Sequence, residues 1–183
     1  GARPLKDGLS ATAFPSGVRN TPVEINESIA PIVIWHKEYR IDSGGAGEYR
    51  GGTGQIMEIA SSENAPFAIA ATFDRVHHAP RGREGGADGF TGKVELTSGT
   101  VLRNKGTQSI PRGDRLHLEM PGGGGYGDPR KRDPERVAVD VRDGMVSATA
   151  ALELYGVVLD DKGAVDGTAT ARRRAETWQQ DNG

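Results

Sequence analysis

Charged and hydroxyl side chains beside glycine-rich turns are the residues of this sequence best suited to bind a small substrate. Arg50 and Arg75 stand out, because a guanidinium group can hold a carboxylate or a phosphate through two parallel hydrogen bonds. The same arginines could instead form structural ion pairs with Asp42 or Asp74. Asp42, Ser43, Glu24 and Glu27 are further polar groups placed beside glycine loops.

The sequence lacks the motifs that are typical of other kinds of catalytic site. His77 and His78 are adjacent, so on a strand their side chains would point to opposite faces and could not easily share one metal ion. The chain has no cysteine, which excludes thiolate chemistry, and no G-x-S-x-G motif of a serine hydrolase. The glycines at 44–47 do not match a P-loop. We therefore assign no catalytic residue and expect no complete metal site in this chain.

Short apolar runs with near-alternation predict the strands that position these residues. The runs are 31–35, 55–60, 67–73, 93–96 and 115–120. Glycine-rich stretches between them have turn and loop composition. Of 27 glycines, 22 lie at or before Gly127, so the first part of the chain is expected to be mostly β.

Helical signals replace the glycines after Asp128. Asp133 before Pro134 is a typical helix start, and Val137, Val141 and Met145 recur every four residues. Ser147 can cap a second helix, and a third is expected from Thr168 to about Gln180. The prediction is an α+β fold with a β-rich glycine-loop domain at 1–128 and a helical C-terminal extension at 129–183.

Four consecutive glycines, Gly122 to Gly125, separate the two predicted parts. Ordering them costs much backbone entropy, so an ordered role requires positive φ angles or another backbone in close approach. The alternative is a flexible hinge, and the residues alone do not decide between the two.

The overall charge gives no reason to expect nucleic acid or membranes as partners. With 23 basic and 25 acidic residues the formal net charge is -2. The longest apolar stretch, near Ile29 to Trp35, is far shorter than the roughly 20 residues of a membrane-spanning helix. Together with the lack of cysteine, this composition favours a cytoplasmic protein.

Several motifs, taken in order, resemble the C-terminal part of the hydantoinase B/5-oxoprolinase family. The resemblance covers nearly the whole chain, and the two long glycine motifs are specific when taken together. The motifs are Asn20–Glu27 with Pro31, Asp42–Gly54, Pro80–Gly86, Pro121–Pro129, Asp140–Gly144 and Tyr155–Val158. The substrate-binding residues that the resemblance implies are Asp42, Ser43, Arg50, Arg75, Tyr126 and Asp128.

The resemblance implies part of a larger subunit that acts in a hetero-oligomer. The expected partners are a hydantoinase A-type subunit, which binds ATP and Mg, and the N-terminal portion of hydantoinase B, where any divalent metal would bind. The implied reaction is ATP-dependent hydrolysis of a small cyclic amide such as a hydantoin or 5-oxoproline. Relatives that carboxylate ketones suggest a subunit of an acetone-carboxylase-like enzyme as the alternative, and a non-catalytic assembly module is a third hypothesis. The isolated chain is expected to be inactive.

One stretch departs from the family pattern. At Pro80–Gly86 the family usually has bulkier apolar residues near the proline, where this chain has Arg81 and Arg83. At this loop we therefore expect the substrate preference of this chain to differ from that of other family members.

Overall fold

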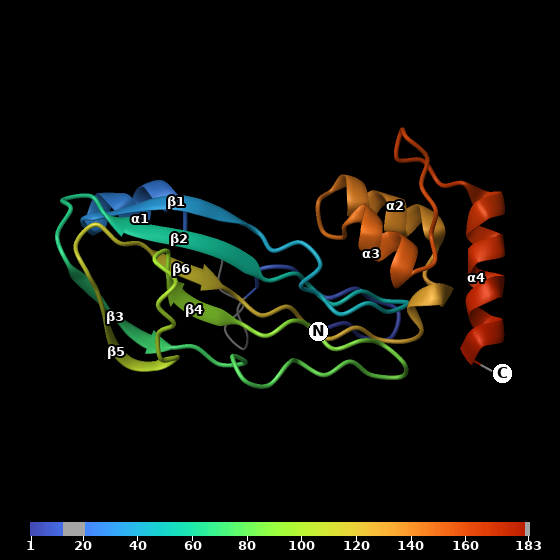
Figure 1. Cartoon of the computed structure of the whole chain (residues 1–183), viewed down its shortest axis with the longest axis horizontal. Coiled ribbons are helices and arrows are strands. Elements are labelled where there is room, and N and C mark those ends of the chain that lie inside the picture. Colours follow the sequence, from blue (N-terminus) through green and yellow to red (C-terminus); the bar gives the residue numbers. More distant parts are fainter. Residues whose placement is uncertain (13–20, 182–183) are drawn as a thin grey trace.

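The chain is elongated, with its β-sheets at one end and its main helices at the other (Figure 1). The computed structural model describes residues 1–12 and 21–181. Long extended segments, rich in glycine, run side by side between the two ends. Strands and C-terminal helices together confirm the predicted α+β fold class.

The helices and strands follow one another with long glycine-rich connections. In chain order they are α1 (Val23–Ile29), β1 (Ile32–Tyr39), β2 (Gln55–Ser61), β3 (Phe67–Thr72), β4 (Lys93–Leu96), β5 (Lys105–Ile110), β6 (Leu116–Glu119), the 3-10 helix η1 (Pro129–Lys131), α2 (Pro134–Arg142), α3 (Ala148–Glu153) and α4 (Gly167–Asp181). The five predicted strands are all present, whereas α1 and β5 are absent from the prediction.

Two antiparallel sheets enclose the apolar core of the β end. One sheet has four strands in the order β1-β2-β6-β4, and the other pairs β3 with β5. Alternate residues of β4 and β6, including Val94, Leu96, Leu116 and Leu118, are buried together with Ile110 of β5. Burial of these side chains holds the two sheets together, since apolar surface is removed from water on both.

Backbone segments, rather than side chains, fill the middle of the molecule. We call residues 7–11, 42–54, 80–89 and 121–127 the glycine bundle. Its segments are joined by main-chain hydrogen bonds, among them Gly45 N to Gly123 O (2.8 Å), Gly123 N to Gly52 O (2.8 Å) and Gly125 N to Ala87 O (2.9 Å). The run from Gly122 to Gly125 is therefore an ordered part of the bundle, which decides against the hinge.

Close backbone approach explains why this region needs glycine. A Cβ atom on Gly122 would overlap the carbonyl oxygen of Ser43, and one on Gly51 would overlap that of Gly123. These neighbours are main-chain atoms held by their own hydrogen bonds, so a rotamer change cannot relieve the overlap.

The helices α2 and α3 begin at the residues that the sequence predicts as caps. Pro129 opens η1, the Asp133 side chain accepts a hydrogen bond from Glu135 N, and Ser147 Oγ accepts one from Ala150 N. The division into domains 1–128 and 129–183 stays a prediction, and residues 13–20 and 182–183 of those ranges lie outside the described part of the chain.

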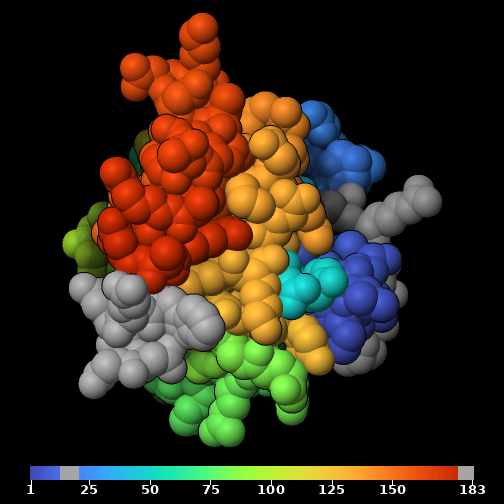
Figure 2. All heavy atoms as spheres, turned by 90° about the vertical axis from the view of Figure 1, so that its right-hand side faces the viewer, coloured from blue at the N-terminus to red at the C-terminus, as the bar shows by residue number. Residues whose placement is uncertain are grey.

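A second apolar core joins the helical extension to the glycine bundle. Val137 of α2, Ala151 of α3 and the following Tyr155 and Val157 are buried against Ala46 of the bundle. Figure 2 shows this end of the molecule, where the orange part of the extension lies between the red α4 on one side and the blue N-terminal segment on the other. Among the described residues, no helix is long and apolar enough to cross a membrane.

Candidate functional site

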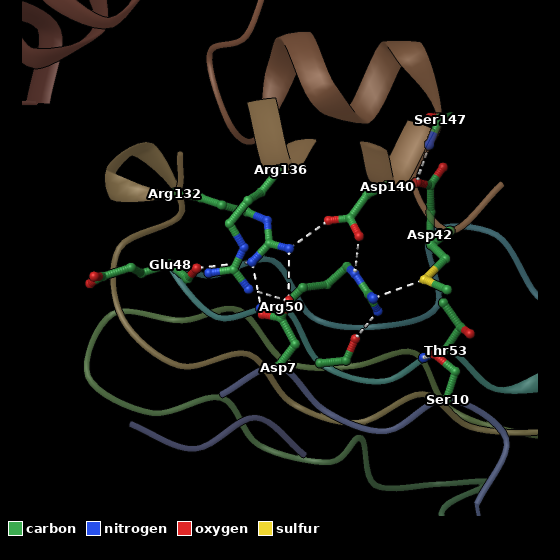
Figure 3. Close-up of polar contacts among 12 residues, drawn as sticks. Asp7, Ser10, Asp42, Glu48, Arg50, Thr53, Arg132, Arg136, Asp140 and Ser147 are labelled. Atoms are coloured by element: carbon green, nitrogen blue, oxygen red, sulfur yellow. Dashed lines mark hydrogen bonds and ion pairs between the residues drawn. The ribbon is translucent and has the colours of Figure 1, made fainter. Parts of the chain in front are cut away.

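Arg132 is the centre of an ion-pair network where the helical extension meets the glycine bundle (Figure 3). Its side chain is 1% exposed. Nη1 and Nη2 donate to the two carboxylate oxygens of Asp7 at 2.8 and 2.9 Å, and Nη2 also donates to Asp140 Oδ2 at 2.7 Å. Arg136 reaches the same Asp7 carboxylate at 2.6 Å. The network thus fastens the N-terminal segment to η1 and α2.

Arg50, a predicted substrate-binding residue, belongs to this network. Its Nε lies 3.2 Å from Asp140 Oδ1, its Nη1 donates to Gly51 O at 2.6 Å, and its Nη2 contacts the sulfur of Met145. The side chain is buried, so it forms the structural ion pair that was the alternative interpretation. Its acidic partner is Asp140, not the expected Asp42.

The network changes the acidity of the groups in it. Burial opposes ionisation of Asp7, but the hydrogen bonds and charge of Arg132 outweigh it and hold the pKa of Asp7 below its usual 3.8. Burial also raises the pKa of Tyr155, which lies in the adjacent core, to about 12. Asp7 is therefore ionised, and Tyr155 protonated, at neutral pH.

Asp7→Asn is expected to lower stability at neutral pH and to matter less in acid. A carboxyl group whose pKa is lower in the folded state stabilises the protein above its unfolded pKa, near 3.8, and loses this effect as pH falls through the folded value. The unfolding free energy of wild type and variant should therefore converge between about pH 4 and pH 2, as measured by urea denaturation.

The matched control for this pH effect is Asp161→Asn. Asp161 is exposed, and no described residue donates a hydrogen bond to its carboxylate. Its variant should follow the wild-type pH profile throughout. A gap between wild type and Asp7→Asn that stays constant down to pH 2 would contradict the role given to Asp7.

Asp42 and Ser43 hold main-chain groups in place. Asp42 has a positive φ of 60°, and its Oδ1 accepts a hydrogen bond from Ser147 N at 2.8 Å. Ser43 is fully buried, donates to Arg40 O at 2.5 Å and accepts from Gly54 N at 2.9 Å. Both side chains are engaged in joining segments of the fold.

Tyr126 and Asp128 lie where the bundle meets the extension. Main-chain hydrogen bonds of 3.0 Å join Tyr126 and Tyr49 in both directions, and their rings lie 6.5 Å apart. Asp128 caps η1 by accepting from Arg130 N at 2.9 Å. These side chains too have clear structural roles.

Arg75 lies apart from the other five predicted residues and lines an open cavity of about 680 Å³. The wall of this cavity is basic, because Arg81, Arg83, His77 and His78 also line it. None of these four was assigned to a site from the sequence. The available signal was the R-x-R spacing, which places Arg81 and Arg83 on the same side of an extended segment.

A group of possible metal ligands lies on the four-stranded sheet. Ligand atoms of Glu95, His117 and Glu119 are within 4.8 Å of one another. Basic side chains already neutralise both carboxylates, since Lys93 lies 2.7 Å from Glu95 and Arg40 lies 2.6 Å from Glu119. The arrangement is that of a charge-paired sheet face, so we do not assign a metal to it.

Sequence comparison identifies the class of protein to which this fold, with its central glycine bundle, belongs. A family model described as Hydantoinase B/oxoprolinase matches residues 1–129. The chain belongs to the hydantoinase B/oxoprolinase family, which confirms the resemblance carried by its glycine motifs.

Named relatives and solved structures agree with this assignment. The chain is 34% identical over 176 residues to the B-type subunit of a putative D-/L-hydantoinase from Pseudomonas sp. (strain NS671), covering 91% of this chain and 29% of the relative. The crystal structure of the ATP-dependent caprolactamase from Pseudomonas jessenii matches with a TM-score of 0.78 and 31% identity, over 96% of this chain and 32% of that one.

The nucleotide-free structure of acetone carboxylase, an enzyme of ATP-dependent acetone carboxylation, is also similar. Its TM-score is 0.73 at 26% identity, over 98% of this chain and 29% of that one. This chain thus spans about a third of the length of the proteins it matches.

Proposed function

We propose that this chain forms the C-terminal part of a hydantoinase B-type subunit that acts in ATP-dependent hydrolysis of a cyclic amide. The observation that supports this proposal most strongly is the structural similarity, over 96% of the chain, to an ATP-dependent caprolactamase. By its name, the substrate of that enzyme is a cyclic amide. A hydantoin or 5-oxoproline contains the same kind of bond in a five-membered ring.

The chemistry of an amide explains the need for ATP. Transfer of the γ-phosphoryl group to the amide oxygen makes the ring carbon more electrophilic. One water adds to that carbon and the C–N bond breaks as the nitrogen takes up a proton, which leaves a free amine and an acyl phosphate. A second water hydrolyses the acyl phosphate to a carboxylate and inorganic phosphate. In this proposal ATP and Mg bind to a hydantoinase A-type partner, and any divalent metal belongs to the N-terminal portion of hydantoinase B.

Exposed apolar side chains support a larger assembly. Leu5 is 85% exposed, Ile29 of α1 is 77% exposed, and Trp35 of β1 is 55% exposed. Apolar groups at several places on one small chain mark surfaces that a partner can cover. We propose that the N-terminal hydantoinase B portion covers some of them in a cytoplasmic hetero-oligomer.

The six residues predicted to bind substrate divide into two groups in this proposal. Arg75 is exposed and lines the basic cavity, so it can reach a ligand. The others support the frame that carries the cavity; they are Asp42, Ser43, Arg50, Tyr126 and Asp128.

The purified chain alone is expected to show no ATP-dependent ring opening, because the proposed ATP site lies on another subunit. Mixed with the N-terminal hydantoinase B portion and an A-type subunit, it should restore release of an N-carbamoyl amino acid from a hydantoin, or of glutamate from 5-oxoproline. Liquid chromatography would follow the product, with omission of ATP as the control. Turnover by the isolated chain, or equal turnover by the mixture without it, would contradict the proposal.

The acetone carboxylase likeness favours a second candidate, a ketone carboxylase subunit. ATP consumption by the same mixture that depends on both bicarbonate and a ketone would select it over hydrolysis. For the third hypothesis, an assembly module, Asp42→Ala and Arg50→Ala are informative. Loss of the complex supports an assembly role, whereas loss of activity in an intact complex supports a site.

A further inference from the structure

The basic cavity beside the glycine bundle has the features of a built anion site. It is formed mainly by the loop between β3 and β4, which runs along the lower side of the bundle in Figure 1. The charged and titratable side chains that line it are those of Arg75, His77, His78, Arg81, Arg83 and Asp88, and Gly1 lines it as well.

The side chains that line the cavity carry excess positive charge. Three arginines and one aspartate give them a formal charge of +2 with neutral histidines. Asp74, next to Arg75, offsets part of that charge through its electrostatic interaction with Arg75. Asp88 is turned toward the loop, where its Oδ1 accepts a hydrogen bond from Gly82 N at 2.7 Å. In the part of the chain that the structure describes, no hydrogen bond or ion pair engages the guanidinium group of Arg81 or Arg83.

The backbone that carries these arginines is fixed by the glycine bundle. Arg83 N donates to Gly125 O at 3.0 Å, and Gly127 N donates to Arg83 O at 3.0 Å. Gly89 N donates to Pro80 O at 2.9 Å, which closes the loop behind Arg81. A fixed backbone lowers the entropy cost of bringing two guanidinium groups onto one ligand.

Arg75 is held toward the same cavity by an unusual backbone conformation. Its φ of 61° is uncommon for a residue with a side chain, and its carbonyl oxygen accepts a hydrogen bond from Gly92 N at 2.9 Å. Strain of this kind persists where the surroundings enforce it, and it clusters at ligand sites.

From this arrangement we propose that the cavity binds a phosphate group. Guanidinium forks match the oxygens of phosphate, and the excess positive charge of the lining side chains favours an anion. The identity of the phosphate carrier rests on the proposed function, which supplies two sources. One is the acyl-phosphate-like group of the activated amide, and the other is the inorganic phosphate released from it.

Direct binding to the whole chain tests the site without requiring activity. Isothermal titration calorimetry with inorganic phosphate and, separately, with acetyl phosphate should give saturable 1:1 binding. The double variant Arg81→Gln/Arg83→Gln should weaken both affinities tenfold or more, because each lost charge-assisted contact carries about that factor. Arg81→Lys keeps the positive charge but loses the forked guanidinium group. Its affinity for each ligand should lie between that of the wild type and that of the double variant.

Arg112→Gln is the matched control, because Arg112 is an exposed arginine on the turn between β5 and β6 and does not line the cavity. It should bind phosphate as the wild type does, and all variants should keep the wild-type Tm. Tighter binding of acetyl phosphate would identify the activated substrate as the source, and tighter binding of inorganic phosphate the released product.

Absence of saturable binding to the wild-type chain would overturn the site. So would equal weakening by the Arg112 variant, since that would reflect net charge alone. Neither result would contradict the proposed function, because that function is tested separately by ring opening in the complete complex.

Discussion

Gly122→Ala is expected to destabilise the chain by at least about 3 kcal/mol, a large part of the 5–15 kcal/mol typical of a folded domain. The new methyl group would overlap the carbonyl oxygen of Ser43, which lies in the neighbouring segment of the glycine bundle. Relief would require the two segments to move apart, and this would break main-chain hydrogen bonds such as Gly45 N to Gly123 O. For a chain of this length the Tm should fall by roughly 6–12 °C.

Gly167→Ala is the matched control for this substitution. A Cβ atom on Gly167, the first residue of α4, would meet nothing within 4 Å. Alanine also favours helix over glycine, so the Tm should stay the same or rise slightly. Calorimetry of both variants decides the matter: equal Tm values would contradict the close packing of the bundle.

Asp140→Ala is expected to cost about 3–5 kcal/mol, because it leaves buried positive charge without a partner. The side chains of Arg132 and Arg50 are 1% and 6% exposed, and both contact the Asp140 carboxylate. Asp7 can still neutralise Arg132, but among the described residues the guanidinium group of Arg50 has no carboxylate other than Asp140 within ion-pair distance. The loss should loosen the attachment of α2 to the glycine bundle.

Urea denaturation and hydrogen exchange together check this expectation. Amides of α2 and α3 should lose protection in Asp140→Ala before those of the β end do. Asp74→Asn is the control, since it removes an exposed carboxylate that pairs with Lys105 on the surface, and it should change little. An Asp140 variant as stable as this control would show that the network is energetically neutral.

Local patterns were sufficient to predict most strands and the C-terminal helices. Alternation predicts β4 and β6 because one face of each is buried between the sheets. Asp133 and Ser147 predict helix starts because their side chains bind the free N–H groups of the first turn. These signals act within a few residues, so no tertiary information is needed.

The two elements absent from the prediction lack such signals. β5 reads Lys-Gly-Thr-Gln-Ser-Ile, with mostly polar residues and a glycine, and it becomes a strand by pairing with β3 along its whole length. α1 is capped by no side chain and has no buried residue. In β5, pairing with a strand distant in sequence overrides weak local preference.

The candidate site shows the same limit at longer range. Arg50 meets Asp140, 90 positions away, and Arg132 meets Asp7, 125 positions away, so neither partner follows from spacing. The guanidinium group of Arg75 beside a glycine loop predicts a binding residue, and of the six predicted residues Arg75 alone lines the cavity in the described structure. Its basic neighbours were visible in the sequence but not recognisable as one surface.

The glycine bundle also bears on how this chain responds to temperature. Its interior consists of peptide groups hydrogen-bonded to one another, where most proteins place hydrocarbon. Exposing polar surface lowers the heat capacity of unfolding, whereas exposing apolar surface raises it. The bundle therefore flattens the stability curve of this region, so that cooling weakens it less than it weakens the apolar cores at either end.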